Sequence, residues 1–410
     1  MENHDGSIDQ TETRPEYTGK QLVFLQRPIA IGFPELLRRL LPRDSRLPSK
    51  KDVVEFPGGR LCARVDGRLE EFRFAPPFHM DSVDSPVLVE PERYIYRIPP
   101  PELEERELSQ PSSEADMDDI TPSLQTIGIP STRLTGRGAI VAILDGGFDR
   151  SHPDFVGRIR RRDMKTFVNA KVDDDFFGHG THCGGIIAGP RHPMIGPRYG
   201  VAPDVCLLVG RVSERVDSDE RAADFAVIRG MWWASVSRGA HIISLSLGTE
   251  LKTLCERRSL IMELITRILR DELGTIVIAA TGNCVDRTVT PIHHPADCPP
   301  IVAVAAVDSM GKVAAFSCGS KCGQRTPTVS APGTGIRSSI PLATNPTNPY
   351  ASLPGTSAAA PHVAGVAALW VERTRGTVRG QRLIDRLKAC VGPLPGQAES
   401  DVGRGLVKAP

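Results

Sequence analysis

Ser357 is the residue whose setting most strongly suggests chemistry. It follows Gly355 and Thr356, three alanines come after it, and apolar residues then recur at helical spacing. A serine at the start of a helix places its hydroxyl where backbone N–H groups and the positive end of the helix dipole favour a developing negative charge. The same sequence also fits a serine that only caps a buried, alanine-rich helix.

Two other polar residues occupy comparable positions upstream. Asp145 ends the apolar run 139–144 and precedes two glycines, and such runs are typical of buried parallel strands. His179 opens a second stretch of small residues, and His182 follows without further ligands at zinc spacing. Taken separately, the aspartate fits a turn and the histidine a structural role. Together with Ser357 they supply an orienting group, a base and a nucleophile, which points to acyl transfer.

In this order the three motifs resemble the signatures of the subtilisin-like serine peptidase family (subtilases, peptidase family S8). They read Asp-Gly-Gly, Gly-His-Gly-Thr-His and Gly-Thr-Ser-Ala-Ala-Ala-Pro-His-Val-Ala-Gly, and the resemblance covers residues 121–410. It implies a serine endopeptidase with the Asp, His, Ser chain order of subtilisin, and hence Asp145, His179 and Ser357 as the triad. It also implies that Asn283, in a Gly-Asn pair after a buried strand, donates to the oxyanion.

The resemblance also assigns a substrate-binding edge. The stretch 244–248 is similar to the strand to which a peptide substrate adds by backbone hydrogen bonds. The expected walls of the primary pocket are Ser246, Leu247 and Gly248 on one side, and Ala280, Thr281 and Gly282 on the other. Their small size predicts an open pocket for apolar or large side chains. The acidic run 173–175 could favour basic residues in the substrate, although such runs are more typical of solvated loops.

Three positions bear on the family pattern. Gly146 stands where the family usually has Thr or Ser, and Ala358 where Met is commonest, but neither position supplies a reacting atom. Asp154 matches one calcium ligand of the family. One carboxylate falls far short of the six to eight oxygens that calcium takes, so we expect no metal and no cofactor.

Strands and helices alternate along residues 121–410, which predicts a parallel sheet covered on both faces. The expected strands are 139–144, 205–209, 241–247, 275–280 and 301–307. The expected helices begin at His179 and Ser357 or span 219–238 and 254–273. The fold class is therefore α/β, with a three-layer, parallel-sheet, subtilisin-like catalytic domain preceded by a small α+β domain.

The first 120 residues differ from the rest of the chain in composition and in their expected secondary structure. Residues 1–19 are polar and are expected to be a disordered tail, and 99–120 begin with three prolines and form a linker. Residues 20–98 resemble the family's prodomain, a folding chaperone and temporary inhibitor; the alternative is a permanent accessory domain. Its expected elements are a helix at 34–41 and strands at 21–25, 52–56, 59–65, 68–74, 87–90 and 94–98. The last strands resemble the segment that precedes the maturation cut, which we expect between Ser85 and Thr121.

Composition limits the other functions. The 410 residues carry a net charge of +1, which gives no basic footprint for nucleic acid, and no apolar run approaches a membrane span. The start lacks the features of a signal peptide, so a cytoplasmic location and nine free cysteines are expected. Four of these, Cys284, Cys298, Cys318 and Cys322, could instead form disulfides or bind zinc.

The sequence thus predicts a self-processing serine endopeptidase zymogen that acts on peptides or proteins and is inhibited by its own N-terminal domain. The alternatives are a non-catalytic relative that binds peptides in the same groove, and a dedicated intracellular enzyme for one precursor. Because Asp145, His179, Asn283 and Ser357 are all present, an active enzyme is favoured.

Overall fold

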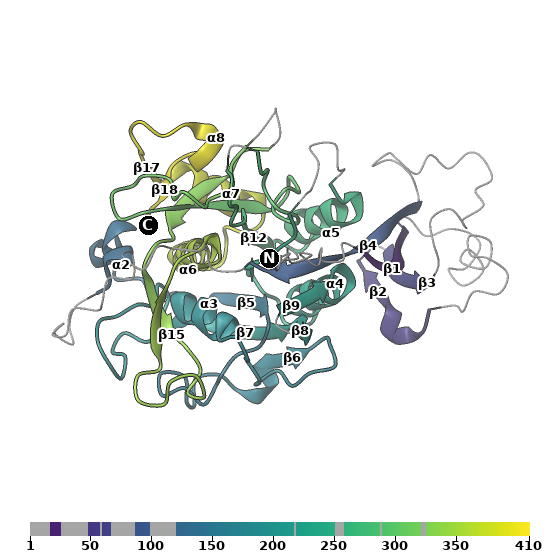
Figure 1. Ribbon diagram of the computed structural model, residues 1–410, viewed down its shortest axis with the longest axis horizontal. Helices are drawn as coiled ribbons and strands as arrows, with labels where there is room; N and C mark the ends of the chain where they lie inside the picture. Colours follow the sequence, from purple (N-terminus) through teal and green to yellow (C-terminus); the bar gives the residue numbers. More distant parts are fainter. Residues whose placement is uncertain are drawn as a thin grey trace, which may run out of the picture.

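A nine-stranded sheet forms the centre of the larger part of the molecule (Figure 1). The computed structural model describes residues 17–25, 48–57, 60–66, 87–98, 120–216, 219–250, 258–287, 289–320 and 325–410. In spatial order the strands are β17 (Val391–Gly392), β18 (Leu406–Val407), β14 (Val329–Pro332), β13 (Val302–Val307), β12 (Ile276–Ala280), β10 (Ile242–Leu245), β5 (Ile140–Asp145), β7 (Cys206–Arg211) and β6 (Met164–Thr166). All neighbours are parallel except β17 and β18.

Helices cover both faces of this sheet. They are α2 (Pro122–Thr126), α3 (His179–Ala188), α4 (Asp224–Trp232), α5 (Leu260–Asp271), α6 (Thr356–Arg373), α7 (Gln381–Ala389) and α8 (Glu399–Val402). Successive residues of β5 point to opposite faces: Val141 and Ile143 pack in the core that contains α3 and α6, and Ala142 and Leu144 in the core that contains α4 and α5. The three-layer α/β prediction is confirmed.

A second sheet joins the N-terminal residues to the catalytic part. Its order is β2 (Val53–Phe56), β3 (Arg60–Asp66), β1 (Tyr17–Leu25), β4 (Val87–Arg97), β9 (Asp219–Ala223) and β8 (Ser213–Val216), and β11 (Leu247–Gly248) also pairs with β4. The first half of β4 is antiparallel to β1, and its last residues pair with β9 and β11. Figure 1 shows β4 reaching from the N-terminal strands into the larger part.

Three of the sequence-based assignments are wrong in detail. Residues 219–223 of the predicted helix 219–238 form β9, because Glu220 and Ala222 alternate as buried residues between β8 and β4. The helix predicted over 254–273 begins only at Leu260, where the Ser259 hydroxyl accepts a hydrogen bond from the Met262 N–H. The strands predicted at 87–90 and 94–98 are one strand, β4.

The remaining described elements include a hairpin that the sequence did not suggest. It consists of β15 (Ile336–Ser339) and β16 (Tyr350–Leu353); short helical turns lie at Lys50–Asp52, Ile129–Ser131 and Arg161–Asp163, and a π-helical turn at Trp233–Ser237. The predicted elements at 34–41 and 68–74, residues 1–16 of the predicted tail and almost all of the linker lie outside the described residues. Residues 17–19, predicted as the end of a disordered tail, instead belong to β1, where Tyr17 pairs with Arg93 of β4. The other proposed domain boundaries stay a prediction.

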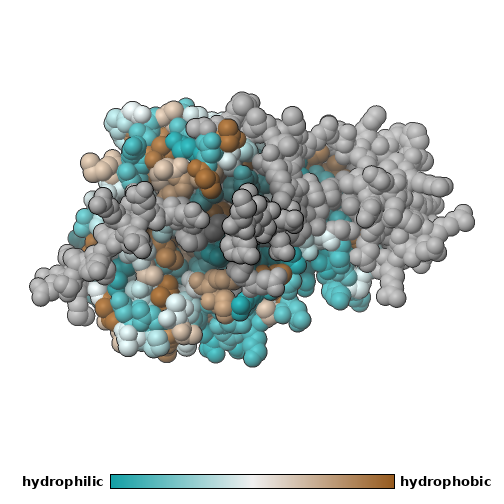
Figure 2. Space-filling view, viewed as in Figure 1, coloured by the Kyte–Doolittle hydropathy of each residue, from teal (hydrophilic) through white to brown (hydrophobic). Residues whose placement is uncertain are grey.

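The described surface shows no single character on the face drawn in Figure 2, where hydrophobic and hydrophilic residues are interspersed. Within the described part of the chain, none of the helices combines the length and the apolar composition needed to cross a bilayer.

Candidate active site

Asp145 and His179 form a buried pair at the carboxyl end of the central sheet. Asp145 is the last residue of β5 and His179 the first of α3, and their Oδ1 and Nδ1 atoms are 2.9 Å apart. Since Nδ1 is held by the carboxylate, Nε2 is left as the proton acceptor. Burial acts to lower the pKa of His179, but the neighbouring Asp145 carboxylate outweighs it, so the pKa is raised well above its usual value.

Local backbone features fix where α3 begins. The Asp175 carboxylate accepts a hydrogen bond from the Thr181 N–H at 2.6 Å, which satisfies one of the free donors of the first turn. Gly180 lies so close to the chain after β5 that a Cβ there would overlap the carbonyl oxygen of Gly147. The first turn of α3 can therefore approach Asp145 only with glycine at position 180.

Ser357 and Asn283 face a common space. Ser357 is the second residue of α6, and Asn283 follows β12. Gly355 has a φ of 143°, and a Cβ on it would lie 2.8 Å from Ser357 Oγ and 3.1 Å from Asn283 Nδ2. The Asn283 Oδ1 accepts hydrogen bonds from the N–H and the hydroxyl of Thr356, at 2.9 and 3.0 Å. The carboxamide is thereby oriented with its N–H groups toward Gly355 and Ser357.

The Cys183 thiol lies close to both the His179 ring and the Ser357 backbone. Its Sγ is 3.9 Å from His179 Nε2 and donates to the Ser357 carbonyl oxygen at 3.3 Å. Ser246 Oγ donates to the same carbonyl oxygen at 2.8 Å. The structure thus gathers His179, Ser246 and Ser357, which are far apart in the chain, around one buried thiol.

The predicted pocket walls face each other, but the space between them is filled rather than open. A Cβ on Gly282 would overlap the His293 ring, and one on Gly248 would lie 3.1 Å from the His293 Cβ and 3.3 Å from the Ile98 Cδ1. The His293 N–H donates to the Thr281 carbonyl at 2.9 Å, which draws its segment in between the walls. Ile98 and His293 thus occupy the space between the walls in this structure, and the open pocket stays a prediction.

His293 is a site residue that sequence reasoning missed. Burial lowers the pKa of His293 to about 4, so the ring is neutral at physiological pH. Neither ring nitrogen has a hydrogen-bond partner among the described residues. Leu247, Ala280 and Thr281 are buried in the walls around it. Nothing in its local sequence distinguishes His293 from a structural histidine, because the ring reaches the pocket only through the fold.

Glu220 is a second residue that sequence reasoning missed. It is 3% exposed, on β9, and a Cβ on Gly146 would overlap its carboxylate. This explains why glycine stands at position 146, where the family usually has a larger residue. Burial, reinforced by the carboxylates of Asp145 and Asp175, raises the pKa of Glu220 to about 7. The Glu220 carboxyl group therefore titrates near neutrality, close to the Asp145–His179 pair.

Two residues of the acidic run 173–175 have partners within the protein, and whether the run favours basic substrates stays a prediction. Asp173 pairs with the exposed Arg150 and Arg161, at 3.6 and 2.8 Å, and Asp175 is buried against the start of α3. Asp175 thus supports the first turn of α3, and Asp173 pairs with surface arginines.

Two described clusters contain the residue types that bind metals. One is Asp145, His179 and Cys183; the other is His294, Asp297 and Cys298. The His294 ring nitrogens are 3.3 Å from Asp224 and 3.1 Å from Asp297, so both are held by carboxylates. Burial acts against its charge, but these carboxylates raise the pKa of His294 well above its usual value. This cluster is consistent with a buried ion pair, and neither cluster leads us to assign a metal.

Other residues named from the sequence also have protein partners. Asp154 accepts hydrogen bonds from the Met194 N–H and from the hydroxyls of Tyr199 and Tyr350. The absence of a cofactor stays a prediction. Cys284, Cys298 and Cys318 are free thiols, and Cys322 lies outside the described residues.

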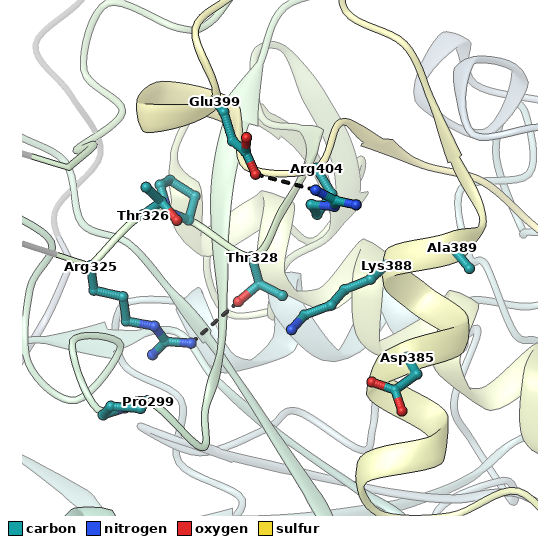
Figure 3. Close-up of a pocket in the computed structure, with 10 residues that line it drawn as sticks. Pro299, Arg325, Thr326, Thr328, Asp385, Lys388, Ala389, Glu399 and Arg404 are labelled. Carbon is teal, nitrogen blue, oxygen red and sulfur yellow. Dashed lines mark hydrogen bonds and ion pairs between the residues drawn. The ribbon is translucent and has the colours of Figure 1, made fainter.

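A separate hollow of about 620 Å³ lies away from the predicted site residues, none of which lines it. Arg325 donates to Thr328, and Glu399 pairs with Arg404 across it (Figure 3). The Arg325 guanidinium also donates to the carbonyls of Ala296, Cys298 and Ile301, which commits it to the backbone. We assign no ligand to this hollow.

Comparisons with known proteins extend these observations. The model of the subtilase family, Peptidase_S8, matches residues 136–382, more than half of the chain. Thermostable alkaline protease from Halalkalibacterium halodurans is 37% identical over 279 residues, which are 67% of this chain and 68% of that protein. Subtilisin E from Bacillus subtilis is 33% identical over 268 residues, 63% of this chain and 62% of its own length. The match thus spans less than two thirds of subtilisin E.

Solved structures show the same fold. Fervidolysin from Fervidobacterium pennivorans superposes with a TM-score of 0.68 at 22% identity, covering 99% of this chain and 61% of that one. The prenylagaramide maturation protease PagA superposes with a TM-score of 0.55 at 28% identity, covering 70% of this chain and 96% of that one.

Proposed function

The chain belongs to the subtilase family, and on this premise we propose that it is a serine endopeptidase with Asp145, His179 and Ser357 as its triad. Ser357 Oγ attacks the scissile carbonyl carbon, and His179 Nε2 takes the serine proton and later delivers it to the leaving nitrogen. Asp145 keeps the imidazole in the required tautomer. The observation that carries this proposal is the buried 2.9 Å contact between Asp145 and His179 at the same edge of the sheet as Ser357.

The oxyanion of the tetrahedral intermediate would occupy the space beside Gly355. Asn283 Nδ2 borders this space, and the Ser357 N–H lies at the start of α6, where the helix dipole adds to its pull on negative charge. The Thr356 contacts hold the Asn283 carboxamide before substrate arrives. The donor therefore needs little reorganisation during the reaction.

Replacing Asn283 with alanine should lower kcat by about 10²–10³-fold, the usual cost of removing one oxyanion donor. The KM should change much less, because the lost hydrogen bond forms mainly in the transition state. Steady-state hydrolysis of a chromogenic peptide measures both constants. Asn348→Ala, at an exposed asparagine, is the matched control. Equal kcat values for the Asn283 and Asn348 variants would contradict the role of Asn283.

We also propose that the N-terminal strands inhibit the enzyme in its zymogen form. The substrate edge predicted from the sequence is occupied by β4: Tyr96 is paired with Gly248 of β11. On its other side Tyr96 is paired with Arg221 of β9, an edge that the sequence did not suggest. A peptide substrate that adds as a strand would need these same backbone positions. While β4 is in place, the groove is closed to other peptides.

Carboxylates of β4 anchor it to the catalytic part. Glu90 accepts hydrogen bonds from the Ser259 hydroxyl and the Leu260 N–H, both at 2.6 Å, at the start of α5. Glu92 is fully buried and accepts from the Phe225 N–H at 3.2 Å, at the start of α4. Both carboxylates satisfy helix donors that have no partner within the helix, and they lie at the positive ends of the helix dipoles. These contacts support a role for the segment in folding as well as in inhibition.

A fluorophosphonate that reacts with activated serines tests the proposed enzyme. We expect covalent labelling of the intact chain on the peptide that contains Ser357, and loss of labelling in His179→Ala, because the serine is then without its base. His192→Ala, at an exposed histidine, should label as the wild type does. The variant Glu90→Gln/Glu92→Gln should label faster, since β4 is then held less firmly. A chain that never reacts at Ser357 would favour the peptide-binding alternative.

The family indicates the class of substrate but not the location in the cell. Peptides or proteins are the substrate class that we propose. The cytoplasmic location stays a prediction.

A further inference from the structure

The pairing of β4 shows which peptide bond is presented to Ser357. Arg97 is paired with Leu247 and Tyr96 with Gly248 in antiparallel register. One further step along both strands sets Ile98 opposite Ser246, whose hydroxyl donates to the Ser357 carbonyl oxygen at 2.8 Å. From this extension of the register we expect the carbonyl of Ile98 to be the one that the docked strand carries to the nucleophile.

The apolar side chains at and near Ile98 are buried. Ile98 is 1% exposed, and its Cδ1 lies 3.3 Å from where a Cβ on Gly248 would be, between the pocket walls. Ile95, three residues earlier, is also 1% exposed. The Arg97 guanidinium carbon is 4.6 Å from the centre of the Phe177 ring, two residues before His179. The segment thus fits the groove as a well-bound substrate would, up to Ile98, the residue whose carbonyl would be attacked.

The residue after Ile98 in the sequence is Pro99, and Pro100 and Pro101 follow. Acylation at this point would join Ser357 Oγ to the Ile98 carbonyl carbon and break the bond from that carbon to the Pro99 nitrogen. The serine proton would have to pass through His179 to the Pro99 nitrogen as that nitrogen leaves.

Proline makes this step unfavourable. Its nitrogen carries Cδ in place of hydrogen, and the ring fixes φ near −65°. The ring carbon therefore occupies space through which the imidazolium would approach the leaving nitrogen. The ring also restricts the residue before it to extended conformations, which agrees with Ile98 continuing the line of β4. A bond from the Ile98 carbonyl carbon to a proline nitrogen is therefore poorly suited to being cut.

We propose that Ile98–Pro99 is a cleavage-resistant bond presented to Ser357, so that residues 87–98 act as a standing inhibitor and not as the first substrate. This inference rests on the proposed serine peptidase activity. It places any maturation cut at a bond other than the one after Ile98. As long as no bond between residues 98 and 120 is cut, the inhibitor stays covalently attached to the enzyme, where its effective concentration is high and dilution does not remove it.

The test replaces Pro99 in the full chain and reads the mass and the new N-terminus. Pro99→Ser should be cut between residues 98 and 99, with loss of the mass of residues 1–98, and should gain peptidase activity on dilution because the inhibitor can then leave. Pro100→Ser keeps the proline at position 99 and is the matched control; like the wild type, it should show no N-terminus at residue 99. Pro99→Ser/Ser357→Ala should also remain uncut.

Three results would overturn the inference. One is a wild-type chain with an N-terminus at Pro99. The second is a Pro99→Ser chain that hydrolyses added peptide and labels at Ser357 but stays intact between residues 98 and 99. The third is a set of variants none of which reacts with the fluorophosphonate, because the enzyme activity on which the inference depends would then be absent; labelling thus distinguishes this failure from the second.

Discussion

Ser357→Ala should lower kcat for peptide hydrolysis by about 10⁶-fold, close to the loss that follows removal of the triad serine from subtilisin. The reason is that neither the acyl-enzyme nor its ester bond can form, while the oxyanion space and the groove remain. His179→Ala should cost about as much, and the double variant little more, because the two side chains act as one unit. Hydrolysis of a chromogenic peptide by matched preparations measures the ratio.

Occupation of the groove by β4 lowers the rates of both preparations alike when both chains are uncut, so uncut preparations are compared. Ser151→Ala, which removes an exposed hydroxyl, should leave the rate unchanged. A Ser357→Ala preparation that kept a tenth or so of the wild-type rate would show that another group is the nucleophile, since a tenfold loss corresponds to only about 1.4 kcal/mol of the barrier.

Asp145→Asn should lower kcat by about 10⁴-fold at neutral pH. The asparagine keeps the size of the side chain but can direct an N–H toward His179 Nδ1, which would place the imidazole proton on Nε2. The nitrogen that faces the serine would then be a donor and could no longer accept the serine proton.

The same variant should also shift the pH profile. In the wild type the carboxylate raises the pKa of His179, so the rate should fall as the pH drops through that raised value and the base becomes protonated. Without the carboxylate, the acid limb of kcat/KM should move to lower pH. Asp173→Asn, on the surface, should leave the limb in place. An unchanged acid limb in Asp145→Asn would mean that the Asp145–His179 contact does not control the base.

The residues of the triad could be predicted because each lies in a short motif with its own local structure. Asp145 closes a buried strand, and His179 and Ser357 open helices, so local sequence both identifies and positions them. The fold class followed from the alternation of apolar runs and helical stretches. The sequence-based roles of these residues, and of Asn283, stay predictions until the variants are measured.

Long-range contacts limited the rest. Glu220 and His293 reach the site across the fold, and nothing in their neighbours along the chain marks them. Residues 219–223 have a helix-compatible sequence, but they pair with β8 and β4, and this pairing overrides local preference. The sequence of the pocket walls did not reveal that Ile98 and His293 lie between them, because both residues come from other parts of the chain.

The two glutamates of β4 also have a consequence for how the enzyme matures. Glu90 and Glu92 accept hydrogen bonds at the starts of α5 and α4, and the strand that carries them pairs with β11, the proposed substrate edge. When β4 leaves, water must accept the hydrogen bonds of the backbone N–H groups at both helix starts. Opening the groove would therefore leave the starts of α4 and α5 less rigid. A substitution at either glutamate would therefore change two properties together: how firmly β4 is held in the proposed groove, and how well the two helix starts are stabilised during folding.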